Sequence, residues 1–390
     1  MKAAEFGKKT KSVAAFVTTN SVCQGVQVPI LWPLIFATGH EIAFAHTSFK
    51  WANLASHNAG VTVAIIAIEV KPTGIRKIYS LGEGGETIVT SADQINAFLV
   101  PGVGIDIQPS RRSISNTAYM DLGNMPKDGG NLLMSFDEAE GLVSLRADAK
   151  RFVFDFVGSQ EFVKGIVRRC LWIEDEAVEE AKKIPEIGQR LDGVRDMRLA
   201  SDAESTRDFA NRPHRFKQIQ GRGRESTIVI PKVTSETRPY LPVGVLSSHS
   251  IVSDNAFALY DAPLWNMALI ASRLHLVWIG TVCGKLETRI RYSNTLGWNT
   301  FPVPTLTEKN KADLTACAED ILLAREAHFP ATIADLYDPE KMPENLRAAH
   351  DRNDETLERI YIGRRFKNDT ERLEKLFEMY TKMTSKKVKA

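Results

Sequence analysis

The stretch VTVAIIAIEV at residues 61–70 decides the fold class of the amino-terminal part of the chain. It is rich in β-branched residues and apolar on both faces, which is typical of a strand that helices cover on both sides of a sheet. Shorter apolar runs at 13–18 and 41–47 predict two more strands. Between them, 26–38 predicts a helix with prolines in its early turns, where a missing N–H costs least. This part therefore predicts an α/β sheet.

Three strands make an incomplete sheet, because so small a piece leaves an exposed edge and little core. The missing strands must come from elsewhere in the chain, from another chain or from a truncated parent. Residues 71–110 contain GEGGE and PGVG and predict a connector with short strands. Beyond it we expect a mixed region and then helices. The expected strands are 151–156 and 227–233, and the expected helices are 174–190, 264–278, 315–328, 351–361 and 370–383.

Composition narrows the class of protein. The chain of 390 residues is 43% apolar and 25% charged, with a net charge of +2, so any nucleic-acid footprint must be local. Four isolated cysteines and no HxxxH or HExxH pattern predict neither a disulfide framework nor a zinc site. The strictly apolar part of 12–40 covers only 28–37, too short for a membrane span. We expect a cytoplasmic protein.

Cofactor loops are absent, but basic residues cluster. GxGxxG and GxxxxGK[ST] do not occur in the right context. Residues 205–244 hold eight basic against three acidic residues, with aromatic residues interleaved, and 285–291 hold a second cluster. Arginines on Gly-rich loops can reach phosphates and base edges, so these clusters are compatible equally with DNA or RNA binding and with a solvated basic surface. The FKW triplet at 49–51, expected in a loop between strands, suits stacking on a planar ligand or simple packing.

Several blocks resemble a known family. TTNSVCQGVQVPILWPLIF (18–36), FAHTSFKWAN (44–53) and VTVAIIAIE (61–69) are similar to the last part of the catalytic domain of MmeI-like DNA methyltransferases. These are adenine-N6 modification enzymes of type IIG/IIL restriction–modification systems and related phage-defence proteins. The resemblance continues through target-recognition blocks and a helical end, with the motifs GNMPKDGGNLLMS (123–135), RRCLWIED (168–175), IPKVTSETRPYLPVG (230–244), SRLHLVWIGTVCGKLETRIRYS (272–293), WNTFPVP (298–304) and ADLYDPEKMPENLRAAH (334–350).

This resemblance implies a mixed α/β and α+β fold in three parts. Residues 1–75 resemble the last strands of a class I, Rossmann-like methyltransferase sheet. Residues 76–304 resemble a connector and a mixed α/β target-recognition domain, and 305–390 a small helical domain. The family's S-adenosylmethionine loop and its Asn-Pro-Pro-aromatic motif do not occur in the sequence. We therefore expect no cofactor to bind this chain alone, although the complete family enzyme uses S-adenosylmethionine.

The resemblance also implies roles for individual residues. Phe49 matches the aromatic that stacks on the extruded adenine, and Asn20 falls in a strand-end motif that supports the base pocket. No catalytic and no metal-ligating residue is predicted. The residues predicted to contact double-stranded DNA combine the family blocks with the basic clusters; they are Arg215, Arg222, Arg224, Arg238, Arg273, Lys285, Arg289 and Arg291.

The resulting expectation is the recognition part of an adenine-specific DNA methyltransferase that is inactive alone. Three alternatives stay open. The chain is a split or truncated enzyme completed by a separate N-terminal methyltransferase polypeptide, a non-enzymatic DNA-specificity module, or a decayed gene fragment.

Overall fold

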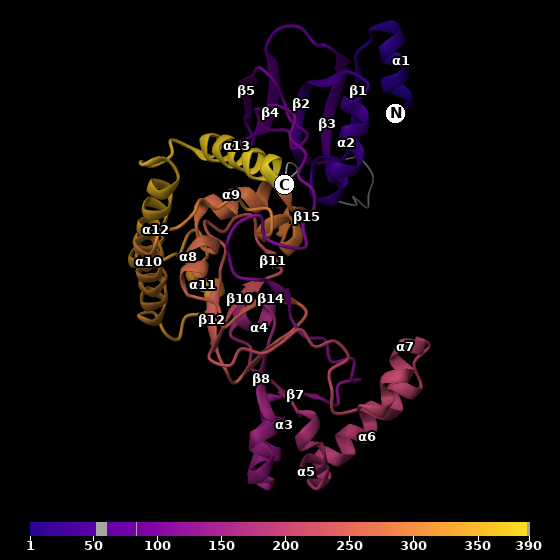
Figure 1. The fold of residues 1–390 in the computed structure, drawn as a ribbon, viewed down its shortest axis with the longest axis vertical. Coiled ribbons are helices and arrows are strands. Elements are labelled where there is room, and N and C mark those ends of the chain that lie inside the picture. Colours follow the sequence, from indigo (N-terminus) through magenta and orange to yellow (C-terminus); the bar gives the residue numbers. More distant parts are fainter. Residues whose placement is uncertain (52–60, 83, 388–390) are drawn as a thin grey trace.

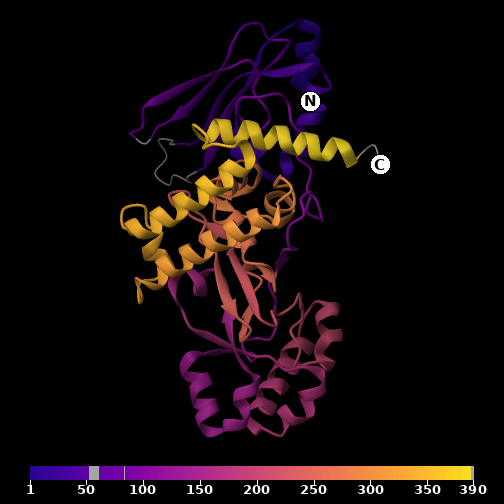
Figure 2. The same cartoon turned by 60° about the vertical axis from the view of Figure 1, so that its left-hand side comes forward.

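The computed structural model describes residues 1–51, 61–82 and 84–387. The molecule is elongated, with the amino-terminal sheet at one end, a small lobe at the other, and a central part between them (Figure 1). Helices of the carboxyl-terminal region flank the central part (Figure 2). The predicted mixed α/β fold with a helical end is confirmed.

The amino-terminal sheet has five strands in the order β1-β3-β2-β4-β5. β3 lies antiparallel to both β1 and β2, β4 runs parallel to β2, and β5 returns antiparallel to β4. The elements are α1 (Lys2–Thr10), β1 (Ala14–Thr19), the 3₁₀ turns η1 (Asn20–Cys23) and η2 (Gly25–Gln27), α2 (Val28–Phe36), β2 (His40–Lys50), β3 (Thr62–Val70), β4 (Arg76–Leu81) and β5 (Thr87–Ala92).

The three predicted strands and the predicted helix are present, but the expected strand count was wrong. The segment that we predicted to be a connector adds β4 and β5 to the same sheet. Short strands were expected in this segment, but not that they extend the amino-terminal sheet. β5 buries only its last residue, so its sequence has no apolar run that would indicate a strand of that sheet. Pro33 lies inside α2, as the sequence indicated.

The central part holds a four-stranded sheet in the order β12-β10-β14-β6 and a three-stranded sheet in the order β11-β16-β15. The predicted helix at 264–278 is two helices, because Ser272 starts the second one by accepting a hydrogen bond from the His275 N–H. The elements are β6 (Asp121–Leu122), β10 (Ser226–Pro231), β11 (Val233–Thr234), β12 (Gly244–Ser247), β14 (Ala256–Tyr260), α8 (Trp265–Ile270), α9 (Arg273–Val282), β15 (Gly284–Leu286), β16 (Arg289–Arg291) and the π-helix η6 (Asn294–Trp298).

The small lobe is built on a sheet in the order β13-β8-β9-β7 and has its own hydrophobic core. Two predictions are corrected. The expected strand at 151–156 is a 3₁₀ turn followed by β8, and the expected helix at 174–190 is broken before Pro185, which starts a new helix. The elements are β7 (Leu133–Ser135), α3 (Phe136–Leu145), η3 (Ala147–Phe152), β8 (Val153–Val157), α4 (Ser159–Lys164), β9 (Arg168–Leu171), η4 (Asp175–Ala177), α5 (Val178–Lys182), α6 (Pro185–Leu199), α7 (Glu204–Arg207), η5 (Asp208–Asn211) and β13 (Ser250–Val252).

The three predicted carboxyl-terminal helices are present and longer than the sequence predicted, and a short fourth helix, α11, was not predicted. They are α10 (Glu308–Glu326), α11 (Ile333–Leu336), α12 (Glu344–Ile362) and α13 (Asp369–Lys387). α13 packs on α9, and its Phe377 ring stacks on Phe98 from the segment after the amino-terminal sheet. One hydrophobic core consequently runs without interruption from Ala4 through the central part to Tyr380.

Candidate nucleic-acid interface

The carboxyl ends of β1 and β2 lie at one edge of the amino-terminal sheet. Both strands run antiparallel to β3, which lies between them, so they point the same way. Thr19 and Phe49 pair with the same residue, Val63, from its two sides. Asn20 follows Thr19 directly. The structure therefore brings the two predicted base-pocket residues, Asn20 and Phe49, to the edge where α/β sheets bind ligands.

Asn20 offers a buried donor at this edge. The residue is 8% exposed, and its backbone carbonyl accepts a hydrogen bond from Cys23 Sγ at 3.0 Å. Its side-chain Nδ2 has no hydrogen-bond partner within residues 1–51, 61–82 and 84–387. Leaving a buried donor unpaired costs about 1–3 kcal/mol, so the atom suits a ligand that accepts a hydrogen bond.

Phe49 lies in β2 and not in the loop that we predicted, and the same holds for Lys50. A register shift between His46 and Phe49 lets β2 stay paired with β3 as far as Lys50. The Phe49 ring meets the edge of the His46 ring at a centroid distance of 4.8 Å and lies 6.3 Å from Trp51. Asn53, which we placed in the same loop, lies outside the described residues.

A basic hairpin packs beside this edge. It comprises β15, β16 and the turn between them, residues 284–291, and it carries three of the predicted DNA contacts, Lys285, Arg289 and Arg291. β15 contacts η2, the turn that follows Asn20: a Cβ on Gly25 would lie 3.3 Å from Gly284 Cα. Figure 1 shows the hairpin directly under the sheet. Gly25 and Gly284, which are 259 positions apart in the sequence, thus lie on one surface.

Positive charge gathers where the hairpin meets the sheet. Arg289 and Arg291 flank the buried Ile290 in β16, and both are exposed. Arg289 pairs with Glu287 at 3.0 Å, whereas Lys285 and Arg291 form no ion pair with any other described residue. The pKa of Glu236 is lowered, despite its partial burial, by a hydrogen bond from Thr288 and by the charges of Arg289 and Lys50. Lys50, at the end of β2, therefore belongs to the same surface, and sequence reasoning did not single it out.

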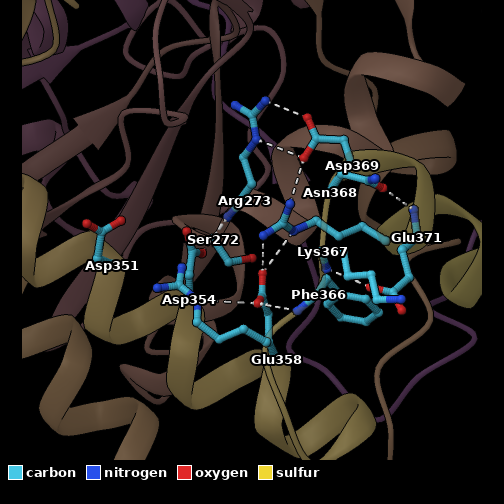
Figure 3. A network of polar contacts seen from close by, with 12 residues as sticks. Ser272, Arg273, Asp351, Asp354, Glu358, Phe366, Lys367, Asn368, Asp369 and Glu371 are labelled. Atoms are coloured by element: carbon cyan, nitrogen blue, oxygen red, sulfur yellow. Dashed lines mark hydrogen bonds and ion pairs between the residues drawn. The ribbon is translucent and has the colours of Figure 1, made fainter.

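Arg273 lies in a different environment, the contact between α9 and the carboxyl-terminal helices. Its Nη2 and Nε donate to the Asp369 carboxylate at 2.6 and 3.2 Å, and Asp369 raises the pKa of Arg273 further. Next to it, the buried Glu358 accepts from Arg372 Nε at 2.8 Å and from the Phe366 N–H at 2.9 Å (Figure 3). This network joins the central part to α12 and α13.

Asp354 in this network predicts a pH dependence of stability. It accepts from the Arg273 N–H at 2.7 Å and from Tyr240 Oη at 3.1 Å, and burial raises its pKa from 3.8 to about 7. Because the folded state keeps this proton to higher pH than the unfolded state, the contribution is complete below pH 4 and is lost as the pH rises through about 7. We expect the stability difference between wild type and Asp354→Asn to shrink by about 1–4 kcal/mol from pH 5 to pH 8. Urea denaturation of both proteins across this range measures it, and a difference independent of pH would contradict it.

Two other predicted contacts, Arg215 and Arg238, are only partly exposed. Arg215 pairs with Glu174 at 3.1 Å and lies 3.7 Å from Asp175. Arg238 is half-buried, and burial lowers its pKa; it forms no ion pair within the described part of the chain. Arg222 and Arg224 are exposed, on a loop at the junction of the central part and the small lobe. The eight predicted cations therefore do not form one surface.

One structurally important residue was missed altogether. Arg198 is completely buried in α6, and its guanidinium donates to five backbone carbonyls, those of Pro126, Lys127, Phe209, Arg212 and Arg215. A signal existed, because Arg198 continues the helical spacing of the buried residues Ile187, Leu191 and Val194.

The described residues give little support to a reactive cysteine, a metal site or a membrane span. The four cysteines are buried and free, and burial raises the pKa of Cys23 to about 11 and that of Cys283 to about 12. In the described ranges, no three His, Cys, Asp or Glu side chains converge to hold a metal ion. None of the described helices combines the length and the apolar character that crossing a membrane requires.

A cavity that could hold a small molecule lies away from the Asn20–Phe49 edge. It has a volume of about 510 Å³ and opens between α2 and residues 94–106. It is lined at the sheet by His40 and Glu41, which begin β2, and therefore lies at the opposite end of that strand from Phe49. At the Asn20–Phe49 edge the described residues include an unpaired buried amide and an aromatic ring, which suit a base.

Known family models match three consecutive parts of the chain. Residues 1–80 match the model of the MmeI DNA-methyltransferase domain, 101–305 that of the MmeI target recognition domain, and 306–388 that of the MmeI C-terminal domain. DNA methyltransferase A of Bacillus subtilis (strain 168) is 36% identical over 383 residues, which are 98% of this chain and 43% of that protein.

A solved structure of the same family is similar to nearly the whole chain. The type IIL restriction–modification enzyme MmeI in complex with DNA superposes with a TM-score of 0.89 at 34% identity, over 98% of this chain and 51% of that one. The chain thus spans about half the length of the relatives it matches. The predicted resemblance is confirmed: the chain belongs to the MmeI family, with sequence from its DNA-methyltransferase, target recognition and C-terminal domains.

Proposed function

We propose that this chain is the DNA-recognition portion of a site-specific adenine-N6 DNA methyltransferase of a restriction–modification or phage-defence system, acting in the cytoplasm. The observation that carries this proposal is the position of the basic hairpin beside the Asn20–Phe49 edge. A cationic element that suits contact with DNA lies next to a sheet edge whose buried amide and aromatic ring suit a single base. An enzyme that acts on an extruded base requires both features side by side.

The hairpin residues Lys285, Arg289 and Arg291 contact double-stranded DNA, with Lys50 adding positive charge at the edge. Phe49 stacks on the extruded adenine, its ring held by His46. The unpaired Asn20 Nδ2 donates to the base or to a group beside it. Unstacking a base costs a few kcal/mol, which stacking on an aromatic ring offsets in part.

The remaining residues predicted to contact DNA fall into two groups. We assign Arg273 and Arg215 structural roles, because carboxylates already pair with both guanidinium groups. Arg222, Arg224 and Arg238 remain candidates for contact with DNA, since they form no ion pair with the described residues.

Methyl transfer needs more than this chain. S-adenosylmethionine supplies the methyl group in such enzymes, and the family's S-adenosylmethionine loop does not occur in the sequence, so we assign no step of the transfer to the residues described above. β1 pairs only with β3 among the described strands and exposes Phe16 and Val17, while α2 exposes Ile30. An open apolar edge is a template for further strands. We propose that a separate N-terminal methyltransferase polypeptide completes the sheet there.

Binding of DNA tests the proposed recognition. We expect the chain to bind a 30-bp duplex with a random core without cofactor, and the affinity to fall steeply between 50 and 200 mM salt. Replacing Lys285, Arg289 and Arg291 together by Gln should weaken binding at least about tenfold and lower the salt slope by about one for each phosphate that is no longer neutralised. The matched control removes three exposed charges from the carboxyl-terminal helices, Lys309, Arg352 and Arg359. Equal behaviour of the two triple variants would refute the assignment.

A methylation assay separates recognition from catalysis. The chain alone should transfer no labelled methyl group to DNA, and transfer should return when a polypeptide with the S-adenosylmethionine loop and the Asn-Pro-Pro-aromatic motif is added. Methylation at a normal rate by the chain alone would overturn the proposal that this chain recognises DNA while a separate polypeptide supplies the catalytic motifs.

A further inference from the structure

Residues 220–226, with the sequence QGRGRES, form a loop that leads into β10 at the junction of the central part and the small lobe. We call it the braced loop. It presents Arg222 and Arg224, and both residues are exposed. Neither guanidinium forms an ion pair with a described side chain, whereas many other arginines of the protein do.

The first brace is Asn124, which is completely buried. Its Oδ1 accepts the N–H groups of Gln220 and Gly221 at 2.8 and 3.3 Å, and its Nδ2 donates to the Gly221 carbonyl at 2.9 Å. A second bond from Nδ2, to the Val252 carbonyl at 3.1 Å, fixes Asn124 to β13. The beginning of the loop is therefore held by a side chain that is itself held.

The second brace is Asp261, which follows β14. Its carboxylate accepts the N–H groups of Arg224, Glu225 and Ser226 at 2.8 to 3.3 Å. These backbone bonds lower the pKa of Asp261, so the carboxylate is charged at neutral pH. Because Asp261 already accepts these three N–H groups, the donors that the end of the loop can offer a ligand are those of its side chains.

The middle of the loop has no room for a side chain at Gly223. A Cβ on Gly223 would lie 2.3 Å from the Ser226 carbonyl oxygen and 2.4 Å from Thr227 Oγ1, so the tight course of the backbone requires glycine. Arg222 lies with Cζ 5.0 Å from the centre of the Phe154 ring, which restricts the orientation of its guanidinium. Two side chains, Asn124 and Asp261, and one glycine thus fix the course of the loop. The two arginines that the loop presents form no ion pair within the described part of the protein.

We propose that the braced loop is a second DNA-contact element, in which Arg222 and Arg224 bind paired acceptor atoms of DNA and Asn124 and Asp261 are positioning residues. Holding the loop in its binding geometry before DNA arrives removes the entropic cost of ordering it. The acceptors are either phosphate oxygens or the O6 and N7 atoms of guanine, which an arginine can pair with in the same forked geometry. This inference rests on the proposed DNA recognition and goes beyond it by naming the loop and its braces.

The arginines are tested by Arg222→Gln and Arg224→Gln, with Arg347→Gln as a matched control on an exposed site of α12. We expect each loop variant to bind the random 30-bp duplex about 5- to 100-fold more weakly than wild type, and the control to bind as wild type. A uniform loss with a salt slope lowered by about one identifies phosphate as the acceptor. A changed base preference in selection from a randomised duplex pool identifies guanine.

Asp261→Ala tests whether Asp261 positions the loop, because two explanations predict opposite changes in DNA affinity. Removing a negative charge near DNA should strengthen binding if only charge matters, and the Arg224 charge does act on Asp261. If Asp261 positions the loop, binding should weaken about 5-fold or more. Asp261→Asn, which keeps one acceptor oxygen and suits the positive φ of 50° at this position, should restore part of the affinity.

A double-mutant cycle completes the test. In a chain that already carries Arg222→Gln and Arg224→Gln, Asp261→Ala should weaken DNA binding no further, since it acts through the arginines. Circular dichroism must show that each variant is folded. Wild-type affinity of the arginine variants, or tighter binding by Asp261→Ala, would overturn the inference while leaving the proposed function intact. Failure of the wild-type chain to bind any duplex would instead overturn the proposed function.

Discussion

Arg198→Lys should destabilise the protein by at least about 3–5 kcal/mol, because no other side chain can satisfy the carbonyls around it. The guanidinium donates through Nε to Lys127, through Nη1 to Phe209 and Arg212, and through Nη2 to Pro126 and Arg215, at 2.8 to 3.3 Å. A lysine has three donors on one atom and cannot reach five carbonyls spread around a planar fork. At least two buried acceptors would be left without partners.

The missing hydrogen bonds also predict where the damage appears. The carbonyls belong to 126–127 and 209–215, two segments that Arg198 ties to α6. Urea denaturation gives the loss of stability, and hydrogen exchange should show faster exchange in these segments than in the carboxyl-terminal helices. Arg195→Lys is the control on the same helix: its side chain is 55% exposed, and we expect a change below about 0.5 kcal/mol. Equal stability of the two variants would refute the role of Arg198.

Glu358→Ala should cost about 3–5 kcal/mol, since it leaves a nearly buried guanidinium without its main partner. Glu358 is fully buried, and the side chain of Arg372 is only 12% exposed. Asp369 also contacts Arg372, at 2.9 Å, but it is shared with Arg273 and cannot replace the missing carboxylate. The Phe366 N–H would have no acceptor either.

A neighbouring ion pair on the same helix provides the control for this prediction. Glu355 pairs with Arg359 one turn away, and its side chain is 41% exposed. Glu355→Ala should cost less than about 1 kcal/mol, because water replaces the partner. Glu358→Gln keeps an acceptor for Arg372 and should fall between the two alanine variants. Thermal unfolding of the three proteins side by side decides the order, and a Glu358→Ala protein as stable as Glu355→Ala contradicts the argument.

Runs of apolar residues were a reliable guide to strands, and segments without such runs were harder to assign. β1, β2 and β3 were predicted because their sequences hold apolar runs, although β1 itself buries none of its residues. β4 and β5, in which only Ile78 and Ala92 are buried, mix apolar with polar residues and hold no such run. Phe49 was placed in a loop because the bulge that keeps it in β2 has no signature in the sequence.

The candidate site shows the same limit more sharply. Phe49 and Asn20 came from the family resemblance, and the basic residues from local charge together with the family's target-recognition blocks. That the hairpin packs on η2, however, depends on contacts across more than 250 positions, which periodicity cannot reveal. Arg198 was overlooked for a different reason. A charged residue in an apolar stripe is usually solvated at the edge of the stripe, and only the carbonyls that surround it in the fold show that it is buried.

The uninterrupted core from Ala4 to Tyr380 joins the amino-terminal sheet, the central part and the carboxyl-terminal helices through packed side chains. Under the proposed function, these packed side chains, and not a flexible linker, set the distance along the double helix between the DNA that the hairpin contacts and the extruded adenine. Relatives that share this core should therefore modify a base at a constant distance from the DNA that the hairpin contacts, even where their target sequences have diverged.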